Sequence, residues 1–81
     1  MKFKMKLKIL YFGVTADITC KDSESVSDIP DTNSLNDMLI GLYPELKNAN
    51  YRIAVNLEMI KENTVMKDGD EVALLPPFAG G

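Results

Sequence analysis

Apolar and polar residues alternate strictly at the start of the chain. Between residues 2 and 12, odd positions carry large apolar side chains, whereas lysines occupy positions 2, 4, 6 and 8. A period of two over this length predicts a half-buried strand whose odd positions face the core. Leu10 and Phe12 share the outward parity of the lysines, yet they are large and apolar. Either the end of this strand is buried on both faces, or it exposes an apolar patch.

A second strand is predicted a short distance further along. Residues 24–29 alternate around Val26 and stop at Pro30, so we expect a strand that pairs with the first one. The intervening residues 14–23 show only weak periodicity. They predict a loop or a short irregular helix.

One helix is predicted from apolar side chains at helical spacing. Asp31 is a good N-cap for it, with Thr32 or Asn33 as alternatives. Beyond the cap, a single apolar stripe recurs at i, i+3, i+4 and i+7 and consists of Leu35, Met38, Leu39 and Leu42. We expect Pro44 to end or kink the helix, and Leu46 to pack beneath the turn that follows.

Three short extended segments complete the pattern, at residues 52–56, 58–60 and 71–75, with a turn at 67–70 before the last of them. This order of elements indicates an α+β domain with one main helix. One helix covers only one face of a sheet, so the other face is wet or bound to a partner. Parity leaves an apolar group on the uncovered face, formed by Leu10, Phe12, Ala73 and Leu75. Such a patch is typical of a docking surface.

The last six residues predict an extended, flexible tail over residues 76–81, behind a folded domain over residues 1–75. Two prolines cannot donate ladder hydrogen bonds, so they end the strand and stiffen the exit. Two glycines without Cβ atoms can enter a channel too narrow for other residues. Six extended residues reach at most about 20 Å, which is far enough to put the α-carboxylate of Gly81 inside another protein. The alternative is a frayed chain end without a function.

Composition excludes several classes of function. The chain has no histidine, which excludes histidine-dependent nucleophilic catalysis and most zinc sites. A net charge of −3 argues against nucleic acid as a partner. No segment approaches the ~20 apolar residues of a membrane span, so we expect no membrane partner and a cytoplasmic location. The single cysteine, Cys20, cannot form an internal disulfide, and we expect it to be a small packed side chain.

Four segments resemble the β-grasp, ubiquitin-like sulfur carriers of the MoaD family, the small subunits of molybdopterin synthase. The matching segments are Ile9–Gly13, Asp28–Pro30, Ala54–Asn56 and, most specifically, Asp68–Gly81. After the first strand, members usually carry an arginine, whereas this chain has Val14-Thr15-Ala16-Asp17. The resemblance implies an α+β, β-grasp fold, in which a mixed sheet of four to five strands packs on one main helix.

The resemblance also implies a function. A ubiquitin-activating-like adenylyltransferase would use ATP to adenylate the carboxylate of Gly81, and a sulfur donor protein would convert it to a thiocarboxylate. The tail formed by Pro76, Pro77, Phe78, Ala79 and Gly80 would insert into the large subunit of molybdopterin synthase. There the sulfur would pass to cyclic pyranopterin monophosphate to form the molybdopterin dithiolene.

Under this interpretation the chain is the non-catalytic sulfur-carrier subunit of a sulfurtransferase, and it binds no metal or cofactor itself. Phe12, Met59 and Leu75 match positions that the family uses for docking, and parity adds Leu10. Three alternatives remain open. The chain could be a sulfur carrier for thiamine or another pathway, a ubiquitin-like modifier conjugated through Gly81, or a plain interaction domain with an inert tail.

Overall fold

The computed structural model describes residues 5–78 of the chain. Its elements are, in order, β1 (Lys6–Tyr11), α1 (Val14–Thr19), β2 (Ser23–Ser27), α2 (Thr32–Leu42), the 3-10 helix η1 (Pro44–Asn48), β3 (Arg52–Val55), β4 (Glu58–Met59) and β5 (Glu71–Leu75). The five strands form one sheet in the order β2-β1-β5-β3-β4. β1 and β5 are parallel, and the other neighbours are antiparallel. The predicted α+β, β-grasp architecture with one main helix is therefore confirmed.

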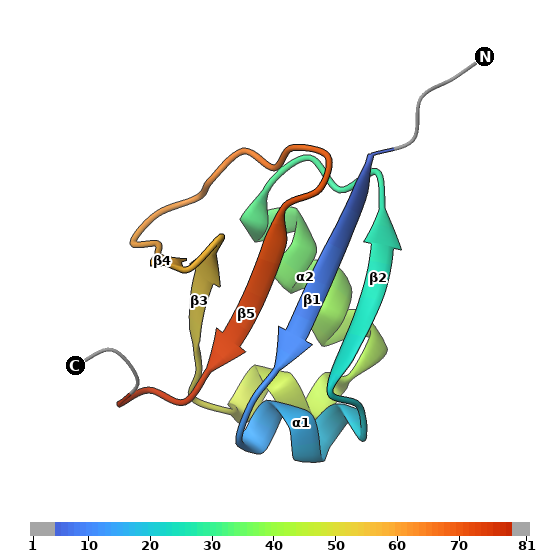
Figure 1. Cartoon of the computed structure of the whole chain (residues 1–81). Coiled ribbons are helices and arrows are strands. Elements are labelled where there is room, and N and C mark those ends of the chain that lie inside the picture. Colours follow the sequence, from blue (N-terminus) through green and yellow to red (C-terminus); the bar gives the residue numbers. More distant parts are fainter. Residues whose placement is uncertain (1–4, 79–81) are drawn as a thin grey trace.

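The helix α2 crosses one face of the sheet, and the opposite face is turned towards the viewer in Figure 1. The buried residues of β1 are Leu7, Ile9 and Tyr11, as the parity of the sequence predicts. They join the buried residues Leu35, Leu39, Leu46, Val55, Met66, Val72 and Leu74 in one core cluster. This inward set fixes the register of the strands, because a slip by one residue would turn it to solvent.

The predicted cap of α2 is confirmed, but one residue of the apolar stripe is not buried. The Asp31 carboxylate accepts a 2.8 Å hydrogen bond from the backbone N–H of Ser34. This bond holds the pKa of Asp31 below its ordinary value. Leu42 was expected in the core, yet 58% of its surface is exposed. The prediction was wrong because α2 ends at Leu42, and Leu46 of η1 is the buried residue there.

Residues 14–23 contain the short helix α1, one of the two predicted possibilities. Cys20 follows it as a left-handed C-cap with φ 59°. Its side chain is exposed, so the expectation of a packed cysteine was wrong. Thr15 and Thr19 are the buried residues of α1, and the cap position carries Cys20 outward.

A polar cluster joins β1, β2 and the end of α2. The carboxylate of Glu24 accepts hydrogen bonds from the hydroxyls of Tyr11 and Tyr43 and from the ammonium of Lys21. Burial alone would raise the pKa of Glu24, but these bonds and the charge of Lys21 outweigh it and lower the pKa. Burial, followed by the bond to Glu24, raises the pKa of Tyr11.

A second polar link fixes the start of β5 against the turn between β3 and β4. The Asn56 side chain donates to the Asp70 carboxylate at 2.9 Å and accepts from the backbone N–H of Glu71 at 2.9 Å. Asp70 is nearly buried and also accepts from the backbone N–H of Lys67 at 2.7 Å. These bonds tie the turn at Asn56 to the turn before β5.

Candidate functional site

The uncovered face of the sheet carries a continuous apolar row. The register pairs Leu10 of β1 with Ala73 of β5, Ala73 with Ala54 of β3, and Ala54 with Met59 of β4. Residues paired directly across neighbouring strands share a face, so this row crosses four strands. Its neighbours in the strands, among them Ile9, face α2 and the core.

An apolar hollow of about 260 Å³ lies on this face. All four predicted docking residues line it, namely Leu10, Phe12, Met59 and Leu75. Phe12 is 44% exposed, and the other three are half-buried. The structure thus brings together one residue each from β1, β4 and β5, and Phe12, which directly follows β1. That they dock a partner stays a prediction.

Three further residues line the hollow that the sequence analysis did not name: Ala54, Leu57 and Glu71. Ala54 could have been found from parity, because Val55 beside it faces the core. Leu57 is 92% exposed in the two-residue turn between β3 and β4. Glu71 is the one charged residue lining the hollow. It lies opposite Lys8 in the register of β5 with β1, at the polar edge of the patch.

Leu57 is held in an unfavourable place for a large apolar side chain. It has φ 72°, and Asn56 before it has φ 49°. Two central residues with positive φ are typical of a type I′ hairpin turn, in which the second residue is usually glycine. A leucine there is strained and also exposes its side chain to water. Backbone strain of this kind often occurs at binding sites, so Leu57 joins the candidate docking residues.

The predicted tail begins beside the hollow. β5 ends at Leu75, as the two prolines predict. Pro76 is half-buried, whereas Pro77 and Phe78 are exposed, with 82% of the surface of Phe78 accessible. Figure 1 shows this segment leaving the end of β5 at the side of β3. Ala79, Gly80 and Gly81 lie outside the described residues, so the tail's extent and the division at residue 75 stay predictions.

The turn after β1 contacts the base of this tail. Gly13 has φ 59° and ψ −132°, a conformation that favours glycine. A Cβ atom built on Gly13 would lie 3.0 Å from the Cγ of Pro76. The backbone N–H of Phe12 donates to the carbonyl of Leu74 at 3.1 Å. The buried hydroxyl of Thr15 lies 3.3 Å from the same carbonyl and donates to the carbonyl of Phe12 at 2.7 Å.

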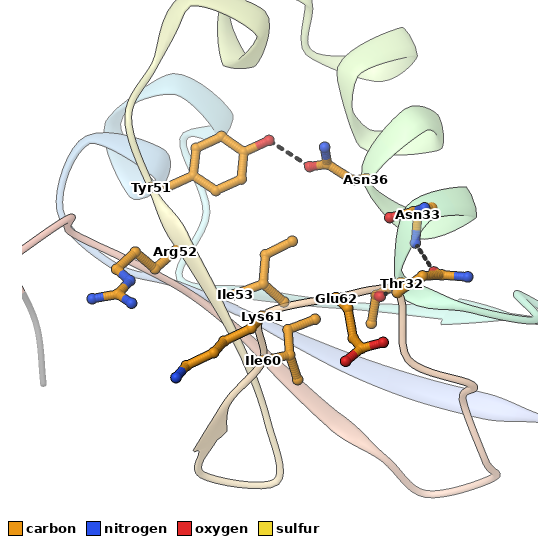
Figure 2. Close-up of a pocket in the computed structure, with 10 residues that line it drawn as sticks. Thr32, Asn33, Asn36, Tyr51, Arg52, Ile53, Ile60, Lys61 and Glu62 are labelled. Carbon is orange, nitrogen blue, oxygen red and sulfur yellow. Dashed lines mark hydrogen bonds between the residues drawn. The ribbon is translucent and has the colours of Figure 1, made fainter.

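A polar hollow lies on a different side, between α2, β3 and the segment after β4 (Figure 2). Several of its uncharged polar groups are occupied by structural hydrogen bonds. The Tyr51 hydroxyl donates to the Asn36 side chain, and the backbone N–H of Asn33 donates to the Asn63 side chain at 2.8 Å. Figure 2 shows Arg52 and Lys61 pointing away from the centre of the hollow. This hollow supports the start of α2 and brings no convergent charged groups together.

Residues 5–78 contain no grouping of three or more cysteine, aspartate or glutamate side chains that could hold a metal ion. No helix in this part of the chain has the length and apolar character needed to cross a membrane.

Comparison with known proteins identifies relatives over almost the whole chain. The ThiS family model matches residues 9–81. The molybdopterin synthase sulfur carrier subunit of Mycobacterium tuberculosis is 38% identical over 82 residues, covering 95% of this chain and 99% of the relative.

Two solved structures share the fold. A chain in the complex of subunits 1 and 2 of molybdopterin-converting factor from Helicobacter pylori 26695 matches with a TM-score of 0.68 and 31% identity, covering 95% of this chain and 100% of that chain. The small archaeal modifier protein 1 of Methanosarcina acetivorans matches with a TM-score of 0.76 at 21% identity, covering 99% and 100%. The latter likeness is one of fold alone. The family match and the identity to the mycobacterial relative together show that the chain belongs to the ThiS family.

Proposed function

We propose that this chain is the sulfur carrier subunit of a molybdopterin synthase. One observation carries the proposal: Leu75 lines the apolar hollow and is also the residue directly before Pro76, where the tail begins. A partner seated on the hollow therefore meets the tail at its base. The sulfur carrier name of the mycobacterial relative and the two-subunit complex from Helicobacter pylori support this function.

The reacting group is the α-carboxylate of Gly81, which is a poor electrophile because it lacks a good leaving group. A ubiquitin-activating-like adenylyltransferase uses ATP, so that a carboxylate oxygen attacks the α-phosphorus and pyrophosphate leaves. The terminal sulfur of a persulfide on a donor protein then attacks the carbonyl carbon, and AMP leaves. A thiol cleaves the remaining S–S bond, which leaves a thiocarboxylate on Gly81 and a disulfide on the donor side.

The tail, which now carries the thiocarboxylate, then enters the large subunit of the synthase. The hollow formed around Phe12, Met59 and Leu75 holds the domain, while residues 76–80 carry the thiocarboxylate into the active site of the partner. Sulfur passes there to cyclic pyranopterin monophosphate, and two such transfers build the dithiolene. This chain supplies no acid, base or cofactor to that reaction, so catalysis belongs to the partner.

Deletion of Gly81 tests the proposal. The shortened chain still ends on a glycine carboxylate, so it changes the reach of the tail rather than its chemistry. We expect a reconstituted system with ATP, the adenylyltransferase, the sulfur donor and the large subunit to lose molybdopterin formation at least a hundredfold. Affinity for the large subunit should fall much less, because the hollow is unchanged.

Undiminished molybdopterin formation by the Gly81-deleted chain would contradict the tail mechanism. A stable isopeptide bond between Gly81 and lysines of other proteins in a cell extract would instead identify the chain as a modifier.

A further inference from the structure

We propose that Gly13 is a positioning residue that sets the direction in which the tail leaves the domain. The inference rests on the proposed function, in which the tail must reach into a partner. Gly13 has no Cβ, so the ring of Pro76 sits directly against its backbone. The contact joins the turn after β1 to the first residue of the tail.

A side chain on Gly13 would crowd the ring of Pro76. A Cβ atom there would lie 3.0 Å from the Cγ of Pro76 and within 4 Å of two further atoms of that ring. Pro76 would have to shift by a few tenths of an ångström or tilt away. The neighbouring chain gives it little freedom to do so, because the carbonyl of Leu74 is held by the Phe12 N–H and lies beside the Thr15 hydroxyl.

A tilt at Pro76 would reorient the residues that directly follow it, because the two prolines leave the backbone at Leu75, Pro76 and Pro77 few accessible conformations. Leu75 and Pro76 each precede a proline, which restricts both to extended conformations. The two proline rings also fix φ near −65°. Six fully extended residues reach at most about 20 Å, so a tilt of about 10° at Pro76 would move the end of the chain by at most about 3 Å. A misplacement of about 1 Å at a reacting group is enough to lower a rate about a hundredfold.

The chain offers two matched controls among its other glycines. Gly69 also has positive φ, at 86°, but a Cβ built on it meets no atom within 4 Å. Gly69→Ala therefore also places an alanine at positive φ, but it does not touch the tail. Gly41 lies in α2, and its Cβ would also meet nothing. Gly41→Ala controls for the substitution itself.

The first experiment measures the free, full-length protein and does not depend on any activity. Residual dipolar couplings of the Phe78 amide in a weakly aligning medium report the direction of the tail base relative to the sheet. We expect Gly13→Ala to change the Phe78 coupling while couplings within β1 and β5 stay within error. Gly69→Ala and Gly41→Ala should leave the Phe78 coupling unchanged. A Phe78 coupling equal to that of the wild type in Gly13→Ala would overturn the proposal.

The second experiment measures function in full-length chains. At saturating adenylyltransferase and ATP, we expect Gly13→Ala to lower the single-turnover rate of adenylation of Gly81 at least tenfold. Its dissociation constant from the enzyme should stay within threefold of that of the wild type. Gly69→Ala should keep both values. An unchanged rate in Gly13→Ala would overturn the positioning role, whereas a wild-type chain that is never adenylated would overturn the proposed function instead.

A reciprocal variant keeps the proposal testable if Gly13→Ala folds poorly. Pro76→Ala removes the ring that Gly13 supports and leaves the turn after β1 intact. We expect it to change the Phe78 coupling by itself. If the two residues act through one contact, adding Gly13→Ala to Pro76→Ala should lower the adenylation rate by less than threefold further. Fully multiplicative effects of the two substitutions would contradict the contact as the cause.

Discussion

Leu57 provides a sharp test of the predicted docking surface. Its backbone strain lowers the stability of the free domain, and its side chain does not pack against the core. It is 92% exposed and adopts φ 72°. A left-handed conformation costs an L-residue about 1–2 kcal/mol, and glycine avoids this strain but loses about 0.5–1 kcal/mol in chain entropy. Leu57→Gly should therefore leave the free energy of unfolding unchanged or raise it by up to about 1.5 kcal/mol.

The same substitution should weaken binding to the large subunit. Each buried methylene contributes about 0.8 kcal/mol, so covering most of a leucine side chain contributes about 2 kcal/mol. A loss of that size raises the dissociation constant about thirtyfold. Leu57→Gly should thus weaken binding without destabilising the free domain. A residue needed for folding would instead lower the free energy of unfolding when it is replaced.

Urea unfolding measures the first quantity, and isothermal titration calorimetry with the large subunit measures the second. Val65→Ala is the control, because Val65 is 72% exposed but does not line the hollow. It should leave the dissociation constant within twofold of that of the wild type. The reasoning is refuted if Leu57→Gly binds as tightly as the wild type, or if it destabilises the free domain by more than about 1 kcal/mol.

Two further predictions concern the polar links of the fold. Asn56→Ala should lower the free energy of unfolding by about 2–3 kcal/mol, since it removes the bonds to Asp70 and Glu71 and places alanine at φ 49°. Urea unfolding measures this effect. Asn50→Ala is the control, because Asn50 is exposed, and it should lower the free energy of unfolding by less than about 0.5 kcal/mol. Glu24 has a lowered pKa, so its contribution to stability is complete above its ordinary pKa of 4.5 and is lost as the pH falls through the lower folded value. The stability difference between wild type and Glu24→Gln should thus shrink between pH 6 and about pH 3, and a constant difference would show that Glu24 is not the group responsible.

The sequence predicted the apolar face because parity is a strict constraint on a sheet. Once Leu7 and Ile9 face the core, Leu10 must face the other way, and the same argument places Ala73 and Leu75. The helix was predicted equally well up to Leu39. The burial of Leu42 was predicted wrongly although Pro44 was expected to end the helix, because Leu42 is the last residue of α2 and Leu46 of η1 is the buried residue there.

Three other features could not be predicted from the spacing of apolar residues, because they depend on local backbone conformation or on contacts between distant segments. The exposure of Cys20 follows from its left-handed cap position after α1, a segment with weak periodicity. Leu57 was missed because its turn reads Asn-Leu, whereas the usual pattern for such a hairpin is Asn-Gly. The contact between Gly13 and Pro76 arises from the parallel pairing of β1 with β5, which joins the two ends of the chain. Only the topology of the sheet reveals it.

The most direct measurement of the central claim is mass spectrometry of the C-terminal peptide. The protein would first be incubated with ATP, the adenylyltransferase and the sulfur donor, and then digested. Intact mass does not suffice, because replacing oxygen by sulfur nearly equals one oxidation of a methionine or of Cys20. The account predicts a thiocarboxylate localised to Gly81. A terminal carboxylate that stays unchanged under these conditions would contradict it.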